Sequence, residues 1–205
     1  TDYWVILADA ASLAKPTIRY ALSLMAYAMR RDLNDRLPII VLGSETLRDL
    51  LPEALHSVKI IDDNVAGWQA KIVAGTLKTP AEHPLPYRMD VYGNDKIGQW
   101  LEIGPREGVW QGIIFGVAGN DASITFQAVG PAGKLPEKTT LEYAREGMKL
   151  EAAGKDYIAG SVRNLIDPNT SYFVRIKGLP QSLLILPDEG SADQEQPEAF
   201  VLTLS

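Results

Sequence analysis

Hydrophobic and polar positions alternate in blocks over the first third of the chain. Three short apolar runs, at residues 3–8, 38–43 and 57–61, are bounded by polar residues and resemble strands that are covered on both faces. Each run is followed by a stretch with helical spacing. The resulting order β-α-β-α-β-α predicts a parallel sheet with right-handed connections, the opening half of a Rossmann-like fold.

The first of these helices is predicted to begin at Pro16 and to end near Asn34. Proline suits the first turn because its missing N–H would have no partner there. Apolar residues recur at helical spacing along one side, which predicts the face that packs into the core. This expected buried stripe consists of Ile18, Leu22, Met25, Met29 and Leu33.

A second apolar strip, formed by Tyr20, Leu24 and Tyr27, lies nearly opposite that stripe on the same helix. A single sheet contact would leave it uncovered, so we expect the later part of the chain to pack there. The alternative is an interaction surface for a protein partner or for a second copy of the chain in a homo-oligomer.

The pattern changes at residues 79–86, where three prolines in eight residues exclude a continuing helix or a central strand. We therefore place a boundary there. Residues 1–80 form the Rossmann-like α/β half and residues 87–205 form a second half, and the two are expected to pack as one unit.

The second half is rich in short apolar segments separated by turn residues, which predicts antiparallel strands. Residues 119–121, Gly-Asn-Asp, are expected to form a hairpin between two of them. Thr139 and Glu142 match a capping box and Gly154 matches a helix stop, so residues 139–154 are predicted to be a helix. Residues 156–166 are a second, shorter helix candidate. The expected class is thus α/β overall, with a β-rich α+β second half.

Charge and composition exclude several classes of partner. The 205 residues carry a net charge of −6 and a pI near 5.0, which argues against nonspecific binding to nucleic acid or to anionic membranes. No apolar run reaches about 18 residues, so we expect no membrane span. The absence of cysteine removes thiolate ligands, thiol nucleophiles and disulfides.

The loops that follow the three predicted parallel strands are the natural place for a ligand, because such crevices form beyond the carboxyl ends of the strands. A small, nucleotide-like ligand is the expectation for this crevice. Its candidate binding residues are Asp9, Ser12, Ser44, Glu45 and Asn64.

The same loops also offer carboxylates that a cation could bring together. If Asp9, Asp62 and Asp63 converge, they would hold Mg²⁺ for a phosphoesterase or nuclease-like hydrolase. The competing interpretation is that Asp62, Asp63 and Asn64 start the next helix, because Asp and Asn are preferred helix caps. We favour the capping interpretation.

Catalytic and cofactor motifs do not fit the sequence. Residues 130–134, Gly-Pro-Ala-Gly-Lys, lack the spacing of a phosphate-binding loop, and the first strand is not followed by a glycine fingerprint. Ser44 and Ser161 lie beside glycines but not in a nucleophile elbow. His56 and His83 are the two histidines, and their spacing does not suggest a zinc site.

The sequence therefore predicts a noncatalytic binding or protein-interaction module without a cofactor. The start on an apolar strand-like run suggests a part of a larger assembly. The alternative function is the Mg²⁺-dependent hydrolase with its acidic cluster.

Overall fold

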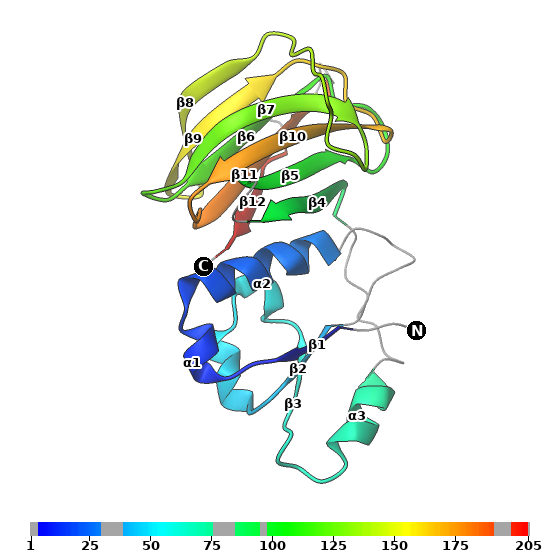
Figure 1. Ribbon diagram of the computed structural model, residues 1–205, viewed down its shortest axis with the longest axis vertical. Helices are drawn as coiled ribbons and strands as arrows, with labels where there is room; N and C mark the ends of the chain where they lie inside the picture. Colours follow the sequence, from blue (N-terminus) through cyan, green and yellow to red (C-terminus); the bar gives the residue numbers. More distant parts are fainter. Residues whose placement is uncertain (1–3, 30–38, 76–84, 95–97, 191–197, 205) are drawn as a thin grey trace. The chain divides into compact units, whose positions relative to one another are not determined.

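The computed structural model describes residues 4–29, 39–75, 85–94, 98–190 and 198–204. The chain divides into two compact units, Thr1–Pro84 and Leu85–Leu204 (Figure 1). The expected boundary at residues 79–86 lies mostly outside the described residues. The packing of the two halves as one unit stays a prediction.

The first unit contains a small parallel sheet with strand order β1-β2-β3. Its strands are only three or four residues long, and Val5 is paired with Ile40 and Val41 with Ile60. The elements of this unit are β1 (Trp4–Leu7), α1 (Ala10–Leu13), α2 (Pro16–Met29), β2 (Ile39–Leu42), the 3-10 helices η1 (Glu45–Leu50) and η2 (Glu53–Leu55), β3 (Lys59–Ile61) and α3 (Trp68–Gly75).

Helix α3 covers one face of this sheet. Ile72 of α3 is buried against Ile40, Leu42 and Ile61, and Trp68 packs at the edge of the same cluster. Burial of such aliphatic side chains contributes about 1.5–3 kcal/mol each to folding. The apolar runs of the sequence thus form the strands that they predict.

Helix α2 buries a different face from the one predicted. Tyr20, Leu24 and Tyr27 are 6%, 1% and 8% exposed, whereas Ile18 and Met25 are exposed on the surface. Helix α2 also packs against η2. The expectation that Ile18 and Met25 form the buried stripe is wrong, and Leu33 lies outside the described residues.

The second unit is a β-sandwich of two antiparallel sheets, which Figure 1 shows stacked on each other. One sheet has the order β4-β5-β10-β7, and the other has the order β12-β11-β6-β9-β8. The strands are β4 (Tyr87–Asn94), β5 (Gly98–Pro105), β6 (Gly112–Ala118), β7 (Ser123–Pro131), β8 (Arg145–Ala152), β9 (Lys155–Val162), β10 (Thr170–Lys177), β11 (Ser182–Asp188) and β12 (Phe200–Thr203).

Aromatic rings from both sheets meet in the interior of the sandwich. The rings of Phe115 on β6 and Tyr172 on β10 lie 6.2 Å apart, and those of Tyr87 and Phe200 lie 5.0 Å apart. Burial raises the pKa of Tyr172, whose hydroxyl donates to Gln127 at 2.7 Å. The inner faces of the two sheets therefore form one apolar core.

The predicted Rossmann-like α/β class is wrong. Strands hold 46% of the described residues and helices 20%, and the second unit is entirely antiparallel. In the first unit the parallel sheet is short, and 3-10 helices replace the expected second α-helix. The alternation of apolar and polar segments along the chain indicates where strands and helices form. It does not determine how many strands pair in one sheet.

The helices predicted for residues 139–154 and 156–166 are also absent, since β8 and β9 form a hairpin there. Ala153 and Gly154, at φ +49° and +69°, occupy the turn between them. Positive φ at both central residues is the geometry of a two-residue hairpin. Gly154 is thus a turn residue and not a helix stop.

The predicted hairpin at residues 119–121 is wrong as well. The strands on either side, β6 and β7, belong to different sheets. The turn therefore carries the chain from one layer of the sandwich to the other. Within the described part of the chain, no helix is long and apolar enough to cross a membrane.

Candidate binding groove

The polar residues predicted to line a crevice in the first unit make local bonds within their own turns. Asp9 accepts a hydrogen bond at 2.7 Å from the N–H of Ser12, and this bond lowers the pKa of Asp9. Ser44 accepts from the N–H of Thr46 at 3.3 Å and caps η1. Glu45 is paired with Arg48. Each of these bonds is what an N-terminal turn requires without a ligand.

Asp62, Asp63 and Asn64 form a compact turn after β3. Asp62 accepts from the N–H of Asn64 at 2.9 Å and from its side-chain amide at 3.1 Å, and Asp63 accepts from the same amide at 3.3 Å. The turn ends before α3 begins at Trp68, so the prediction that Asp63 or Asn64 caps that helix is wrong. Among the described residues, no group of three His, Cys, Asp or Glu is placed to hold a metal ion.

A groove with a volume of about 820 Å³ lies within the second unit. It is formed by the five-stranded sheet, on the face directed away from the four-stranded sheet. Four strands and the segments that flank them provide its walls. Residues that line it include Ile114 of β6, Tyr143, Arg145 and Met148 on the β8 side, Ser161 and Arg163 on the β9 side, and Leu186, Asp188 and Glu189 on the β11 side.

Strand register places four groove residues in one row across the sheet. Leu186 is paired with Ile114, Ile114 with Ser161, and Ser161 with Arg145. Directly paired residues of antiparallel strands share a face. The row therefore runs from an apolar floor at Leu186 and Ile114, through a hydroxyl, to a cation at Arg145.

A second row across the sheet has a glycine, Gly112, at its centre. Asp188 is paired with Gly112, whose other side approaches Arg163. A Cβ at Gly112 would lie 2.6 Å from the carbonyl oxygen of Val162, so only glycine permits this approach of β6 and β9. No side chain therefore projects from β6 between Asp188 and Arg163.

Tyr143 is the most exposed aromatic residue of the groove, at 81%. Its backbone has φ +49°, a left-handed conformation that is uncommon for a residue with a side chain. Such a conformation costs on the order of 1–2 kcal/mol and persists where the surrounding structure enforces it. The ring is thus presented to solvent at an energetic cost.

The segment that carries Tyr143 is fixed at several points. The buried Asn164 accepts from the N–H of Glu142 at 2.9 Å and donates to the carbonyl of Thr140 at 2.9 Å. The N–H of Arg163 donates to the carbonyl of Glu142 at 2.8 Å. On the far side, the amide of Gln127 donates to the carbonyl of Arg145 at 3.2 Å. The backbone around Tyr143 is therefore held before any ligand arrives.

The side chains of Arg145 and Arg163, unlike the backbone of this segment, are not held by hydrogen bonds within the described part of the chain. Arg145 and Arg163 are exposed, and within the described part of the chain neither guanidinium group makes a hydrogen bond or an ion pair. The ion pairs Glu45–Arg48 and Lys134–Glu137 lie outside the groove and involve neither arginine. Two cationic groups with five donors each thus face the groove.

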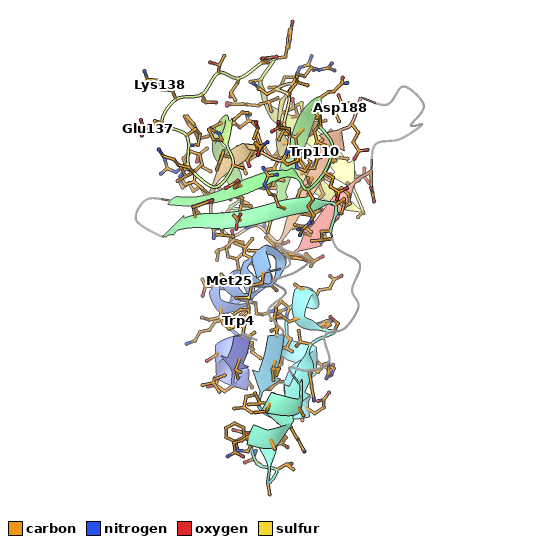
Figure 2. The ribbon with its side chains drawn as sticks, turned by 90° about the vertical axis from the view of Figure 1, so that its right-hand side faces the viewer. Trp4, Met25, Trp110, Glu137, Lys138 and Asp188 are labelled. Atoms are coloured by element: carbon orange, nitrogen blue, oxygen red, sulfur yellow. The ribbon has the colours of Figure 1, made fainter. Side chains whose placement is uncertain are left out.

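The opposite wall is acidic and is also anchored through its backbone. The N–H of Gln111 donates to the carbonyl of Asp188 at 2.5 Å, and the carboxylate of Asp188 accepts from the N–H of Gly190 at 3.0 Å. Figure 2 shows Asp188 near Trp110, the neighbour of Gln111 in the chain. Glu189 extends this wall.

The groove contains no activated nucleophile. The hydroxyl of Ser161 has the sulfur of Met148 as its partner, at 4.0 Å, and not a histidine or a carboxylate. An activated serine requires a base within about 3 Å. His56 lies in the first unit, bonded to the carbonyl of Leu51, and His83 is outside the described residues.

None of the groove residues except Ser161 entered the sequence analysis. Residues 139–154 and 156–166 were interpreted as helices. That interpretation gave no reason to place Arg145 and Arg163 on the same sheet face as Ile114. The missed signal is the alternation Met148, Leu150, Ala152, which has the two-residue period of a half-buried strand.

Comparisons with known proteins do not identify this chain. No family model matches it, and no curated protein matches it. One similar solved structure, described as the crystal structure of ChBD3 from Thermococcus kodakarensis KOD1, covers 55% of this chain and 92% of its own. The sequence identity is 9% and the TM-score is 0.30, so this likeness is too weak to carry an argument.

Proposed function

We propose that the chain is a noncatalytic binding module that holds its ligand in the groove on the five-stranded sheet. The observation that carries this proposal is Tyr143, an exposed ring kept in a strained backbone conformation by a hydrogen-bonded segment. Strained residues with firm support are typical of ligand sites.

The surroundings of Tyr143 support binding and not catalysis. Arg145 and Arg163 offer hydrogen-bond donors without partners among the described residues, and Ile114 and Leu186 provide an apolar floor. A largely preformed site of this kind loses little conformational entropy when it binds. Ser161 has no base to activate it.

The proposal is tested with two unbiased probe sets on the intact chain. One is a phage-displayed library of random linear peptides, and the other is an array of neutral and anionic oligosaccharides. The dissociation constant of each hit is then measured for the wild type and for Tyr143→Ala. We expect binding to weaken at least about tenfold in the variant, as for a truncated aromatic anchor.

Leu165→Ala is the matched control, because Leu165 is 68% exposed, follows Arg163 closely in the chain and does not line the groove. Its affinity should equal that of the wild type. Hits whose dissociation constants are unchanged by Tyr143→Ala, or the absence of hits in both probe sets, would contradict the proposal.

A further inference from the structure

The groove has walls of opposite charge that do not neutralise each other. Asp188 lies on β11 and Arg163 follows β9, with β6 between those strands. Neighbouring strands are about 4.8 Å apart, so the two backbones are separated by about 10 Å. Because Gly112 has no side chain, none projects from β6 between the two charges, and a ligand that lies on the sheet can contact both.

The floor next to these charges is aliphatic. Ile114, Met148 and Leu186 line it, each partly exposed. Aliphatic and thioether groups gain most from contact with another apolar side chain, and methionine adapts its shape to different partners. The floor therefore suits a branched or aromatic side chain of a ligand.

We infer that the groove takes an extended peptide segment with a carboxylate for Arg145 and Arg163, a cationic side chain for Asp188, and an apolar residue between them. This inference rests on the proposed function of the groove. A strand rises about 3.3 Å per residue, so two charges that match walls about 10 Å apart lie about three residues apart in the peptide.

Other polymers match only part of this arrangement. The charged groups of nucleic acid are all phosphates, which Asp188, Glu189 and the net charge of −6 repel. An anionic polysaccharide would satisfy Arg145 and Arg163 but has no cation for Asp188 and no aliphatic side chain for the floor. A peptide provides all three groups within a few residues.

The first test selects peptides from the random library on the wild-type chain and determines the sequences of the enriched clones. We expect an acidic and a basic residue about three positions apart with an apolar residue between them. A synthetic peptide of the consensus should bind at least about tenfold more weakly to Arg145→Ala/Arg163→Ala, and its binding should weaken with added salt.

Arg175→Ala is the matched control for the loss of charge. Arg175 is exposed and lies on β10 of the other sheet. Its removal changes the net charge as each groove substitution does, so a general electrostatic effect would appear there too. We expect an unchanged dissociation constant.

A polarity swap tests the geometry directly. Arg163→Asp combined with Asp188→Arg exchanges the charges of the two walls and conserves the net charge. We expect this variant to bind the consensus peptide at least about tenfold more weakly and to regain affinity for a peptide with its acidic and basic residues exchanged.

The possible failures are distinguishable. Peptide binding that is weakened by Tyr143→Ala but unchanged in Arg145→Ala/Arg163→Ala and in the charge-swapped variant would contradict the inferred charge pattern. The groove would then remain the proposed binding site. Arginine-dependent binding of polygalacturonate without enrichment of any peptide would overturn the peptide inference and retain the site. Peptide binding that is insensitive to Tyr143→Ala would overturn both proposals.

Discussion

The two units of this chain use polar residues in opposite ways. In the first unit, the side chains of Asp9, Ser44 and Asp62 bind the backbone of their own turns. In the second unit, the backbone around Tyr143 is bound by other residues, and the side chains of Arg145 and Arg163 are left without partners among the described residues. In the first unit, the polar side chains with local partners support the fold. A polar side chain without one, on a fixed backbone, is available to a ligand.

The largest expected effect separates the two units by stability. Phe115→Ala empties the centre of the sandwich core, where the side chain is fully buried beside Tyr172. Loss of a buried phenylalanine costs about 3–5 kcal/mol in free energy of unfolding. Hydrogen exchange should report this loss in the amides of β6 and β10. An equal loss of protection in β1, β2 and β3 would show that the units do not differ in this respect.

A smaller effect is expected where the backbone of the groove is anchored. Asn164→Ala removes the bonds to Thr140 and Glu142 and should lower the free energy of unfolding by about 1–3 kcal/mol, because it leaves polar backbone groups without partners. Limited proteolysis should then cut faster at residues 140–145. The control Asn169→Ala alters an exposed asparagine. Equal cleavage in both variants would contradict the anchoring role of Asn164.

In the first unit, the corresponding test concerns a cap. Ser44→Ala should lower the free energy of unfolding by about 1 kcal/mol, the usual contribution of an N-cap serine. We also expect millimolar Mg²⁺ to leave the melting temperature of the wild type unchanged, since Asp9 and Asp62 already have backbone partners. A rise with Mg²⁺ that Asp62→Ala/Asp63→Ala abolishes would restore the metal-binding hypothesis, because a ligand of the native state must stabilise it.

The smallest expected effect is a gain in stability. Tyr143→Gly and Ala153→Gly each place glycine at a positive φ, and each should raise the free energy of unfolding by about 0.5–1 kcal/mol. Only Tyr143→Gly should also abolish ligand binding, because Ala153 lies in the β8–β9 turn and does not line the groove. Denaturant titration measures the stability of both. A loss of stability in Tyr143→Gly would mean that its ring supports the fold.

The sequence predicts local strands well in both units. The apolar runs at residues 3–8, 38–43 and 57–61 correspond to β1, β2 and β3, and most of the second unit consists of antiparallel strands, as expected. The helix prediction for residues 139–166 failed because a capping-box pattern and Gly154 imitate helix signals, while the decisive information is the pairing of β9 with β8 and with β6. That pairing is a long-range property of the sheet.

The groove could not be predicted from the sequence, because it too depends on how strands pair. Leu186, Ile114, Ser161 and Arg145 come from four strands, and only their register places them in one row. The acidic residues of the first unit drew attention because they are neighbours in the chain. Proximity in sequence explains their local hydrogen bonds, and proximity across a sheet defined the candidate site.

Hydrogen–deuterium exchange of the intact chain, with and without a peptide selected on it, tests the central claim most directly. We predict that added protection is confined to the groove, at residues 140–148, 161–163 and 186–190. Protection at residues 9–12, 44–46 and 62–64 of the first unit, with none in the groove, would contradict it.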